Sequence, residues 1–291
     1  MKTYLDCIPC FLRQSLEAGR NVSSDPALHE TILREVLKMT LDLDMTETPP
    51  AMGQAIHRRL REITGVADPY AAAKTRFNHL AMDILPELEE DVAKSADPLL
   101  AAAKFAIAAN LIDLGIIASL TEDETRDALR QSSAIPLHGD AEAFHEAIRA
   151  AKDILYLADN AGEIAVDRLL IERLDPKRVT LAVRGAPVIN DATRADARAV
   201  GLDTIVKEII DNGSDAPGTI LETCSATFRE HFAAADLIIA KGQGNFETLS
   251  DVAANIYFLF KVKCPVIAGH VGLPLGTHVL LHATEIANLA T

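Results

Sequence analysis

Residues 154–163 read ILYLADNAGE, a short apolar run that ends in a carboxylate, an amide and a glycine. Comparable apolar runs recur as VTLAV (179–183), KEII (207–210), LIIA (237–240) and PVIAG (265–269). Helical stretches are expected between them, at about 162–174, 191–200, 217–233 and 246–261. Short apolar strands that alternate with helices predict a parallel sheet covered on both faces. We therefore expect an α/β fold with a three-layer α/β/α Rossmann-like sheet in residues 151–291.

Residues 1–150 have a different pattern and predict an all-helical N-terminal subdomain with no strand. Asp97 and Pro98 are a helix cap followed by a first-turn proline, and Asp140 is a second cap. Further helices are expected at about 54–63 and at 69–93, the latter bent at Pro86. The chain is thus expected to divide near residue 150.

Composition narrows the range of possible functions. The chain has 291 residues and a formal net charge of −14. This charge argues against a nucleic-acid partner, which needs a basic surface. No apolar run is long enough for a membrane span, and the N-terminus lacks the apolar region of a signal peptide, so a cytoplasmic protein is expected. An acidic protein attracts an anionic substrate only if its site holds a cation.

The first polar cluster follows the run at 154–158. Asp159 and Asn160 leave the expected strand, and Glu163 opens the next helix. Carboxylate and amide oxygens suit Mg²⁺ or Mn²⁺, and a helix N-terminus attracts anions. The alternative is an ordinary helix cap at Asp159 with Asn160 in a turn.

The second cluster lies in VRGAPVINDATRAD (183–196). Arg184 ends a strand, and Asn190 and Asp191 begin the next helix, with Asp196 just over one turn later. Either aspartate is a candidate third metal ligand. The alternative makes Asp191 a cap and Asp196 a solvated helix residue.

The third cluster is KGQGNFE (241–247). Lys241 ends a strand and can bind phosphate as a point charge, and Asn245 can cap the helix or contact the ligand. The Gly-x-Gly is neither a dinucleotide fingerprint nor a Walker A loop. In NGSDAPGT (212–219), Ser214 can contact substrate or cap a helix.

Two polar pairs in the helical half are also candidates. Asn110 and Asp113 share one face of an apolar helix and either reach the crevice or bond within the subdomain. Cys7 and Cys10 share a helical face as well. They can pack, lie near the substrate, form a redox pair or supply half of a zinc site.

Several motifs together resemble those of a known family. DCIPCFLRQSLEA, AANLIDLG, LADNAGE, VRGAPVINDAT, NGSDAPGT and KGQGNFETL occur in this order over nearly the whole chain. They resemble the damage-control metallophosphatases, in particular the microbial subfamily with an N-terminal Cys-x-x-Cys. The resemblance implies hydrolysis of small phosphorylated metabolites, notably sugar phosphates, with Mn²⁺, Ni²⁺, Co²⁺ or Mg²⁺.

The resemblance also implies a metal held by Asp159, Asn160 and Asp196, with Lys241 near the phosphate. We expect water to be the nucleophile, with Glu163 or Asp191 as base, although attack by an aspartate is an alternative. The expected catalytic residues are Asp159, Asp196, Lys241 and Glu163. The expected substrate contacts are Asn110, Asp113, Arg184, Asn190, Asp191, Ser214 and Asn245.

Two other functions fit the same pattern. A Rossmann-type transferase or nucleotide-binding protein would use KGQGNFE as its glycine loop and would bind nucleotide or S-adenosylmethionine without added metal. A non-catalytic module would bind sugar phosphate or metal without releasing phosphate. Only an assay of activity separates these alternatives from a phosphatase.

Overall fold

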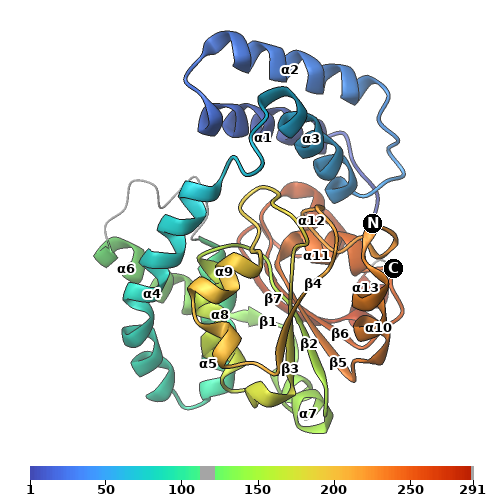
Figure 1. Cartoon of the computed structure of the whole chain (residues 1–291). Helices are drawn as coiled ribbons and strands as arrows, with labels where there is room; N and C mark the ends of the chain where they lie inside the picture. The colour runs from blue at the N-terminus through green and yellow to red at the C-terminus, as the bar shows by residue number, and fades with distance from the viewer. Residues whose placement is uncertain (112–121, 290–291) are drawn as a thin grey trace.

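The computed structural model describes residues 1–111 and 122–289, in which seven strands form one sheet between two layers of helices (Figure 1). The strands are β1 (Leu137–His138), β2 (Ile154–Leu157), β3 (Val179–Val183), β4 (Glu208–Asp211), β5 (Leu237–Lys241), β6 (Ile256–Lys261) and β7 (His278–His282). Their order is β1-β7-β6-β5-β2-β3-β4. Every neighbouring pair is parallel except β6 with β7. The predicted α/β fold is confirmed.

The helices of the first half are α1 (Cys7–Val22), α2 (Pro26–Leu41), α3 (Pro49–Thr64), α4 (Ala71–Ala93), α5 (Pro98–Ala108), α6 (Glu122–Ser133) and α7 (Ala141–Ala150). Those of the second half are α8 (Glu163–Ile171), α9 (Arg194–Ala199), α10 (Ala226–Ala234), α11 (Gly242–Leu249), α12 (Pro265–Val271) and α13 (Ala283–Leu289). None of the helices in the described ranges combines the length and apolar character that a membrane span requires.

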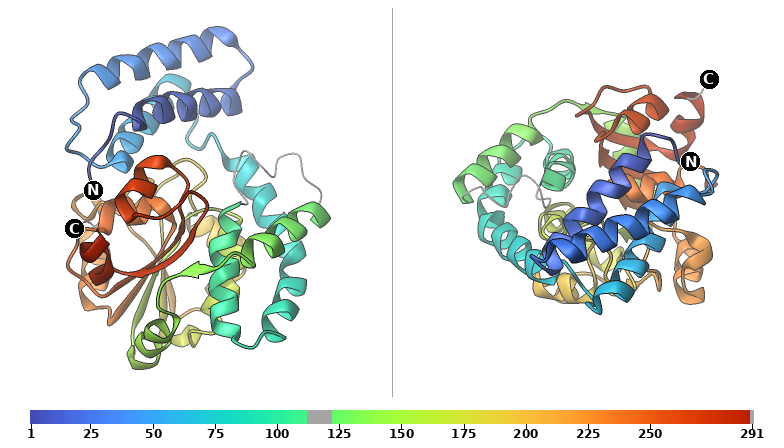
Figure 2. Two further views of the ribbon diagram at one scale, coloured as in Figure 1. Left: turned by 180° about the vertical axis from the view of Figure 1, so that it is seen from behind. Right: turned by 90° about the horizontal axis from the view of Figure 1, so that it is seen from above.

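Alternate residues of each strand enter two separate cores, because successive side chains point to opposite faces of a sheet. Ile154 and Tyr156 of β2 pack in the core shared with α4, α5 and α8. Leu155 and Leu157 pack in the core shared with α10, α11 and α12. Figure 2 shows the two helical layers on either side of the sheet.

Helices α1–α3, here called the helical cap, have a third core of their own, which includes Phe11, Ile32 and Ile56. The cap stands over one end of the sheet (Figures 1 and 2). Helices α4, α5 and α7 instead share a core with the strands. That core joins residues on both sides of position 150, and the division predicted there stays a prediction.

The local signals for helix starts acted as expected. Asp97 accepts a hydrogen bond from the Leu100 N–H at 3.0 Å, and Asp140 accepts one from the Ala143 N–H at 2.9 Å. Each bond satisfies a backbone donor that has no partner within its helix. Pro86 lies inside α4, which runs unbroken from residue 71 to 93.

Three sequence-based assignments were wrong. PVIAG (265–269) is not a strand but lies in α12, which has Pro265 at its first position and Cys264 as N-cap. Residues 256–261 are strand β6 rather than the end of a helix. The first half contains β1, a two-residue strand paired with β7. By periodicity alone, short apolar runs fit a strand or a buried helix equally well.

Candidate active site

Asp159 and Asn160 follow β2 at the point where the strand order reverses. The chain leads from β2 to β3 on one side, whereas β5 pairs with β2 on the other. Such a switch point opens a crevice beyond the carboxyl ends of the strands. Both side chains are buried there, as is Glu163 at the start of α8.

The loop after β3 folds back over this strand end. The Ala192 N–H donates to the Asp159 carbonyl at 2.7 Å, and the Ala161 N–H donates to the Asn190 carbonyl at 2.8 Å. Asn160 and Asp191 pair as an isolated antiparallel bridge. These backbone contacts hold Asp191 beside the Asp159–Asn160 pair.

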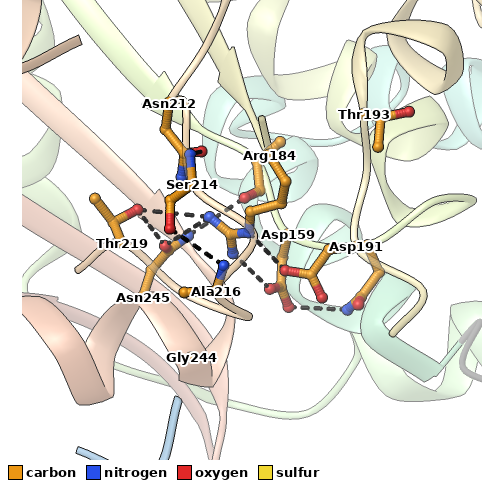
Figure 3. A network of polar contacts seen from close by, with 12 residues as sticks. Asp159, Arg184, Asp191, Thr193, Asn212, Ser214, Ala216, Thr219, Gly244 and Asn245 are labelled. Atoms are coloured by element: carbon orange, nitrogen blue, oxygen red, sulfur yellow. Dashed lines mark hydrogen bonds and ion pairs between the residues drawn. The ribbon is translucent and has the colours of Figure 1, made fainter. Parts of the chain in front are cut away.

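The Arg184 guanidinium is paired with the carboxylates of both Asp159 and Asp191 (Figure 3). Its Nε donates to Asp191 Oδ2 at 2.6 Å, and its Nη2 lies 3.6 Å from Asp159 Oδ1. Its Nη1 donates to Asn245 Oδ1 at 3.2 Å, and Thr219 Oγ1 donates to the same oxygen at 2.8 Å. Asn245 is fully buried, and its hydrogen bond with Arg184 helps to hold the guanidinium in place.

The site has an excess of negative charge. Burial raises the pKa of the Asp159 carboxyl well above its usual range, and the charges of Glu163 and Asp191 raise it further. The charges of Arg184 and Lys263 lower the pKa of Asp159, but by less than burial and the two carboxylates raise it. A cation placed beside Asp159 would stabilise its ionised form.

Beneath the site, Lys241 is fully buried and has three acceptors. Its Nζ donates to the Ala106 carbonyl at 2.8 Å, to Glu163 Oε1 at 2.7 Å and to Asp167 Oδ1 at 2.5 Å. Although burial lowers it, the pKa of Lys241 is raised by Asp167 and Glu163. An ammonium has three donors, so this one is fully used within the protein.

Glu163 connects the lysine to the strand end. Its Oε2 accepts from Asn110 Nδ2 at 2.6 Å and from Asn160 Nδ2 at 3.2 Å. Those two amides also donate to Asp159 Oδ2, at 3.3 and 2.8 Å. Glu163 thereby orients both amides beside the aspartate.

Asp196 has a different set of hydrogen-bond partners. It is the N3 residue of a capping box at the start of α9, where its Oδ2 accepts from the Thr193 N–H at 2.9 Å. Its Oδ1 accepts from Asn78 Nδ2 at 2.9 Å, and Lys74 Nζ lies 3.5 Å from Oδ2. Asn78 Oδ1 in turn accepts from the Gly162 N–H at 2.7 Å.

A cavity of about 420 Å³ lies between the helical cap and the strand ends. Its lining on the sheet side includes Asp159, Asn160, Asn190 and Asp191. Its other charged lining residues are Asp6, Arg13, Glu17, Glu247 and Lys263. The volume is in the range of cavities that bind small molecules.

Cys7, Cys10 and Cys264 line the same cavity, the first two from α1. All three thiols are free, as is that of Cys224. Burial raises the pKa of Cys7 and of Cys10. Because thiolate is the reactive form, this shift disfavours redox chemistry at the pair.

A family model matches the chain over residues 3–279, and its description is "Damage-control phosphatase ARMT1-like domain". The chain belongs to this family. The resemblance noted in the sequence is thereby confirmed, and with it the enzyme class of phosphatase. The Cys-x-x-Cys subfamily stays a prediction.

Relatives of the ARMT1-like family match over their whole length. A protein of Archaeoglobus fulgidus named damage-control phosphatase is 36% identical, covering 94% of this chain and 96% of the relative. Damage-control phosphatase PH1575 of Pyrococcus horikoshii is 31% identical over 97% of this chain and 98% of its own length. The crystal structure of PH1575, described as a DUF89 family protein, matches with a TM-score of 0.89 and 28% identity, covering 97% and 99% of the two chains.

In this ARMT1-like chain, four of the residues predicted from the sequence meet at the cavity: Asp159, Asn160, Asn190 and Asp191. Others surround or support that group without lining the cavity: Asn110, Glu163, Arg184, Lys241 and Asn245. Ser214 bonds instead to Thr223 Oγ1 at 2.7 Å and accepts from Gln54 at 3.2 Å. Asp113 lies outside the described residues.

Sequence reasoning assigned no role to five charged residues of the cavity: Asp6, Arg13, Glu17, Glu247 and Lys263. Glu247 belongs to KGQGNFE, so a motif pointed to it, but no chemical role was assigned. Lys263 follows the unrecognised strand β6, and nothing in its neighbourhood of the sequence marked it. A residue of this kind is found only when the strand before it is placed correctly.

Proposed function

We propose that this ARMT1-like phosphatase hydrolyses small phosphate monoesters, such as sugar phosphates, with the help of a divalent metal ion. One observation carries the proposal: Asp159, Asn160 and Asp191 line a cavity that is also lined by Lys263. Oxygen ligands for a metal and a cation for an anionic ester are the two requirements of such a reaction.

The donor set fits a hard divalent ion. Two carboxylates and one amide oxygen are typical ligands of Mg²⁺ and Mn²⁺. Among the described residues, no group of three or more His, Cys, Asp and Glu is arranged to hold a metal. We assign the ion to Asp159, Asn160 and Asp191, because these three residues line the cavity and Asp196 does not. A bound ion would neutralise charge that develops on the phosphate.

The phosphate is assigned to Lys263 in place of Lys241. Lys263 lines the cavity, and its charge lowers the pKa of Asp159 and of Glu247. Lys241 is fully buried, and all three of its donors bond to acceptors within the protein, one of them Glu163. Arg184 does not line the cavity, and its Nη2 lies 3.6 Å from Asp159 Oδ1, so we assign it the role of orienting that carboxylate.

Of the two bases considered from the sequence, Asp191 lines the cavity and Glu163 does not. We assign proton removal from the attacking water to Asp191. Glu163 is assigned a positioning role, since its oxygens are bonded to Lys241, Asn110 and Asn160.

The test is a phosphate-release screen across sugar phosphates after chelation and re-addition of Mn²⁺, Ni²⁺, Co²⁺ or Mg²⁺ separately. We expect release only with an added ion, and we expect Asp159→Asn to abolish it while the circular dichroism spectrum is retained. Full metal-dependent activity in Asp159→Asn would refute the site. Tight nucleotide binding with no phosphate release would favour a nucleotide-binding protein instead. The cytoplasmic location and the absence of a nucleic-acid partner stay predictions from the sequence.

A further inference from the structure

Glu247 lines the cavity, but neither the proposed metal site nor the proposed phosphate site includes it. It lies on α11, whose first residue, Gly242, is packed against Asp159. Five residues at the helical rise place Glu247 about 7.5 Å further along the axis. Both Asp159 and Glu247 line the cavity. Glu247 therefore lies in the wall of the same cavity as Asp159, about 7.5 Å along α11 from the residue that contacts that carboxylate.

Burial favours the protonated form of the Glu247 carboxyl group, whereas its polar neighbours favour the ionised form. Gln243 Nε2 donates to its Oε1 at 2.8 Å, and no partner of Oε2 is found in the described parts of the chain. Burial raises the pKa of Glu247 to about 7, although Gln243, the Met1 amino group and Lys263 lower it. A carboxyl group with this pKa can both give and regain a proton near neutral pH.

We propose that Glu247 donates a proton to the departing oxygen of the phosphate ester. The inference rests on the proposed phosphatase function and adds the group that acts on the alcohol side of the reaction. The bond from phosphorus to the ester oxygen breaks, and its electron pair stays on that oxygen. The oxygen takes the proton of Glu247 and leaves as an alcohol. One water is consumed: its oxygen forms the new bond to phosphorus, and its proton passes to Asp191 and then, through solvent, restores Glu247.

This role also defines a class of substrate. An alkoxide is a poor leaving group in water and gains most from a proton donor, whereas a nitrophenolate leaves without one. The position of Glu247 therefore suits esters of aliphatic alcohols, the class to which sugar and polyol phosphates belong. Aryl phosphates would be hydrolysed without help from this residue.

The test compares Glu247→Gln with the wild-type protein on two substrates, a hexose 6-phosphate and p-nitrophenyl phosphate, with the same added ion. Glutamine keeps the shape but cannot donate the proton. We expect kcat for the hexose phosphate to fall on the order of 100-fold and kcat for the aryl ester to stay within about threefold. Glu230→Gln, which removes an exposed carboxylate of α10 outside the cavity, is the control and should change neither value.

Equal losses on both substrates, or no loss on either, would overturn the inference while leaving the phosphatase intact. A wild-type protein that hydrolyses neither ester with any of the four ions would refute the proposed function itself. The two failures are thus distinct.

A second readout needs no variant. The titratable and charged groups that act on Glu247 are the Met1 amino group, Lys263, Cys7 and Cys10. In the wild-type protein, kcat for the hexose phosphate should fall as pH rises above about 7, and kcat for the aryl ester should not. Identical profiles above neutral pH would contradict the role of Glu247, whether or not Glu247→Gln folds.

Discussion

Gly242 lies so close to Asp159 that a Cβ at Gly242 would be 2.0 Å from the Asp159 Oδ2 atom. Gly242 also has a φ of +79°, which glycine adopts without the strain that a side chain would bring. The first glycine of KGQGNFE therefore allows helix α11 to approach the Asp159 carboxylate closely.

Gly242→Ala should move the Asp159 carboxylate and lower kcat/KM on the order of 100-fold, the cost of misplacing a catalytic group by about 1 Å. Steady-state kinetics with saturating metal would measure it. Gly269→Ala is the control, because a Cβ there meets nothing within 4 Å. Normal activity in Gly242→Ala would show that the contact has no bearing on the site.

Asp191→Asn and Asp196→Asn separate the two candidate metal ligands. Loss of a residue that only orients a metal ligand typically weakens metal binding by roughly 10–100-fold. We expect Asp191→Asn to raise the metal concentration needed for half-maximal activity by more than this. Asp196→Asn should instead cost about 1–2 kcal/mol of unfolding free energy, because it weakens the cap of α9 and the pairing with Lys74. Metal titration and urea denaturation measure the two effects. If Asp196→Asn weakened metal binding and Asp191→Asn only lowered stability, Asp196 would be the metal ligand instead of Asp191.

Lys241→Met and Lys263→Met test which lysine faces the phosphate. Removing Lys241 leaves Glu163 and Asp167 buried without a counterion and should cost about 3–5 kcal/mol of stability. Removing Lys263 should change stability by less than about 0.5 kcal/mol and raise KM about 10–100-fold. An unchanged KM in a folded Lys263→Met protein would contradict its assignment.

Asp215 holds the helical cap to the sheet domain. It accepts hydrogen bonds from Gln54 at 2.7 Å and from Arg58 at 2.6 Å, and it pairs with Arg61. Asp215→Asn should loosen the cap and raise KM more than it lowers kcat, because part of the cavity wall belongs to α1 and α3. Asp211→Asn is the control, since Asp211 pairs with Arg194 outside the cap. Equal effects of both variants would argue against a role of the cap in binding.

His57 predicts a pH dependence of stability. Burial and the charge of Arg61 together lower its pKa from 6.5 to about 4. The unfolded chain thus binds one more proton than the folded chain between these two values, and stability falls as pH drops from about 6.5 toward 4. Urea denaturation at several pH values should show a smaller fall in His57→Gln than in the wild-type protein. Replacing the exposed His79 by Gln should leave the fall unchanged.

Much of the fold was predictable from local pattern. The apolar runs at 154–157, 179–183 and 237–240 are strands, because each is continuous and ends in polar residues. The runs around β6 and α12 were misassigned, since a short apolar segment carries no period that separates strand from buried helix. For α12, Pro265 at the first helical position is a local signal of a helix start.

The amino-acid sequence by itself determined which polar groups follow which strands, because neighbours in the chain stay neighbours in space. It therefore placed Asp159, Asn160 and Asp191 at one edge of the sheet. Only the tertiary structure decided which of these groups meet. Asp191 rather than Asp196 lies beside Asp159, because the loop after β3 folds back through the Ala192–Asp159 backbone bond. Whether a lysine faces the cavity or the core likewise depends on the packing of distant helices, which no local pattern encodes.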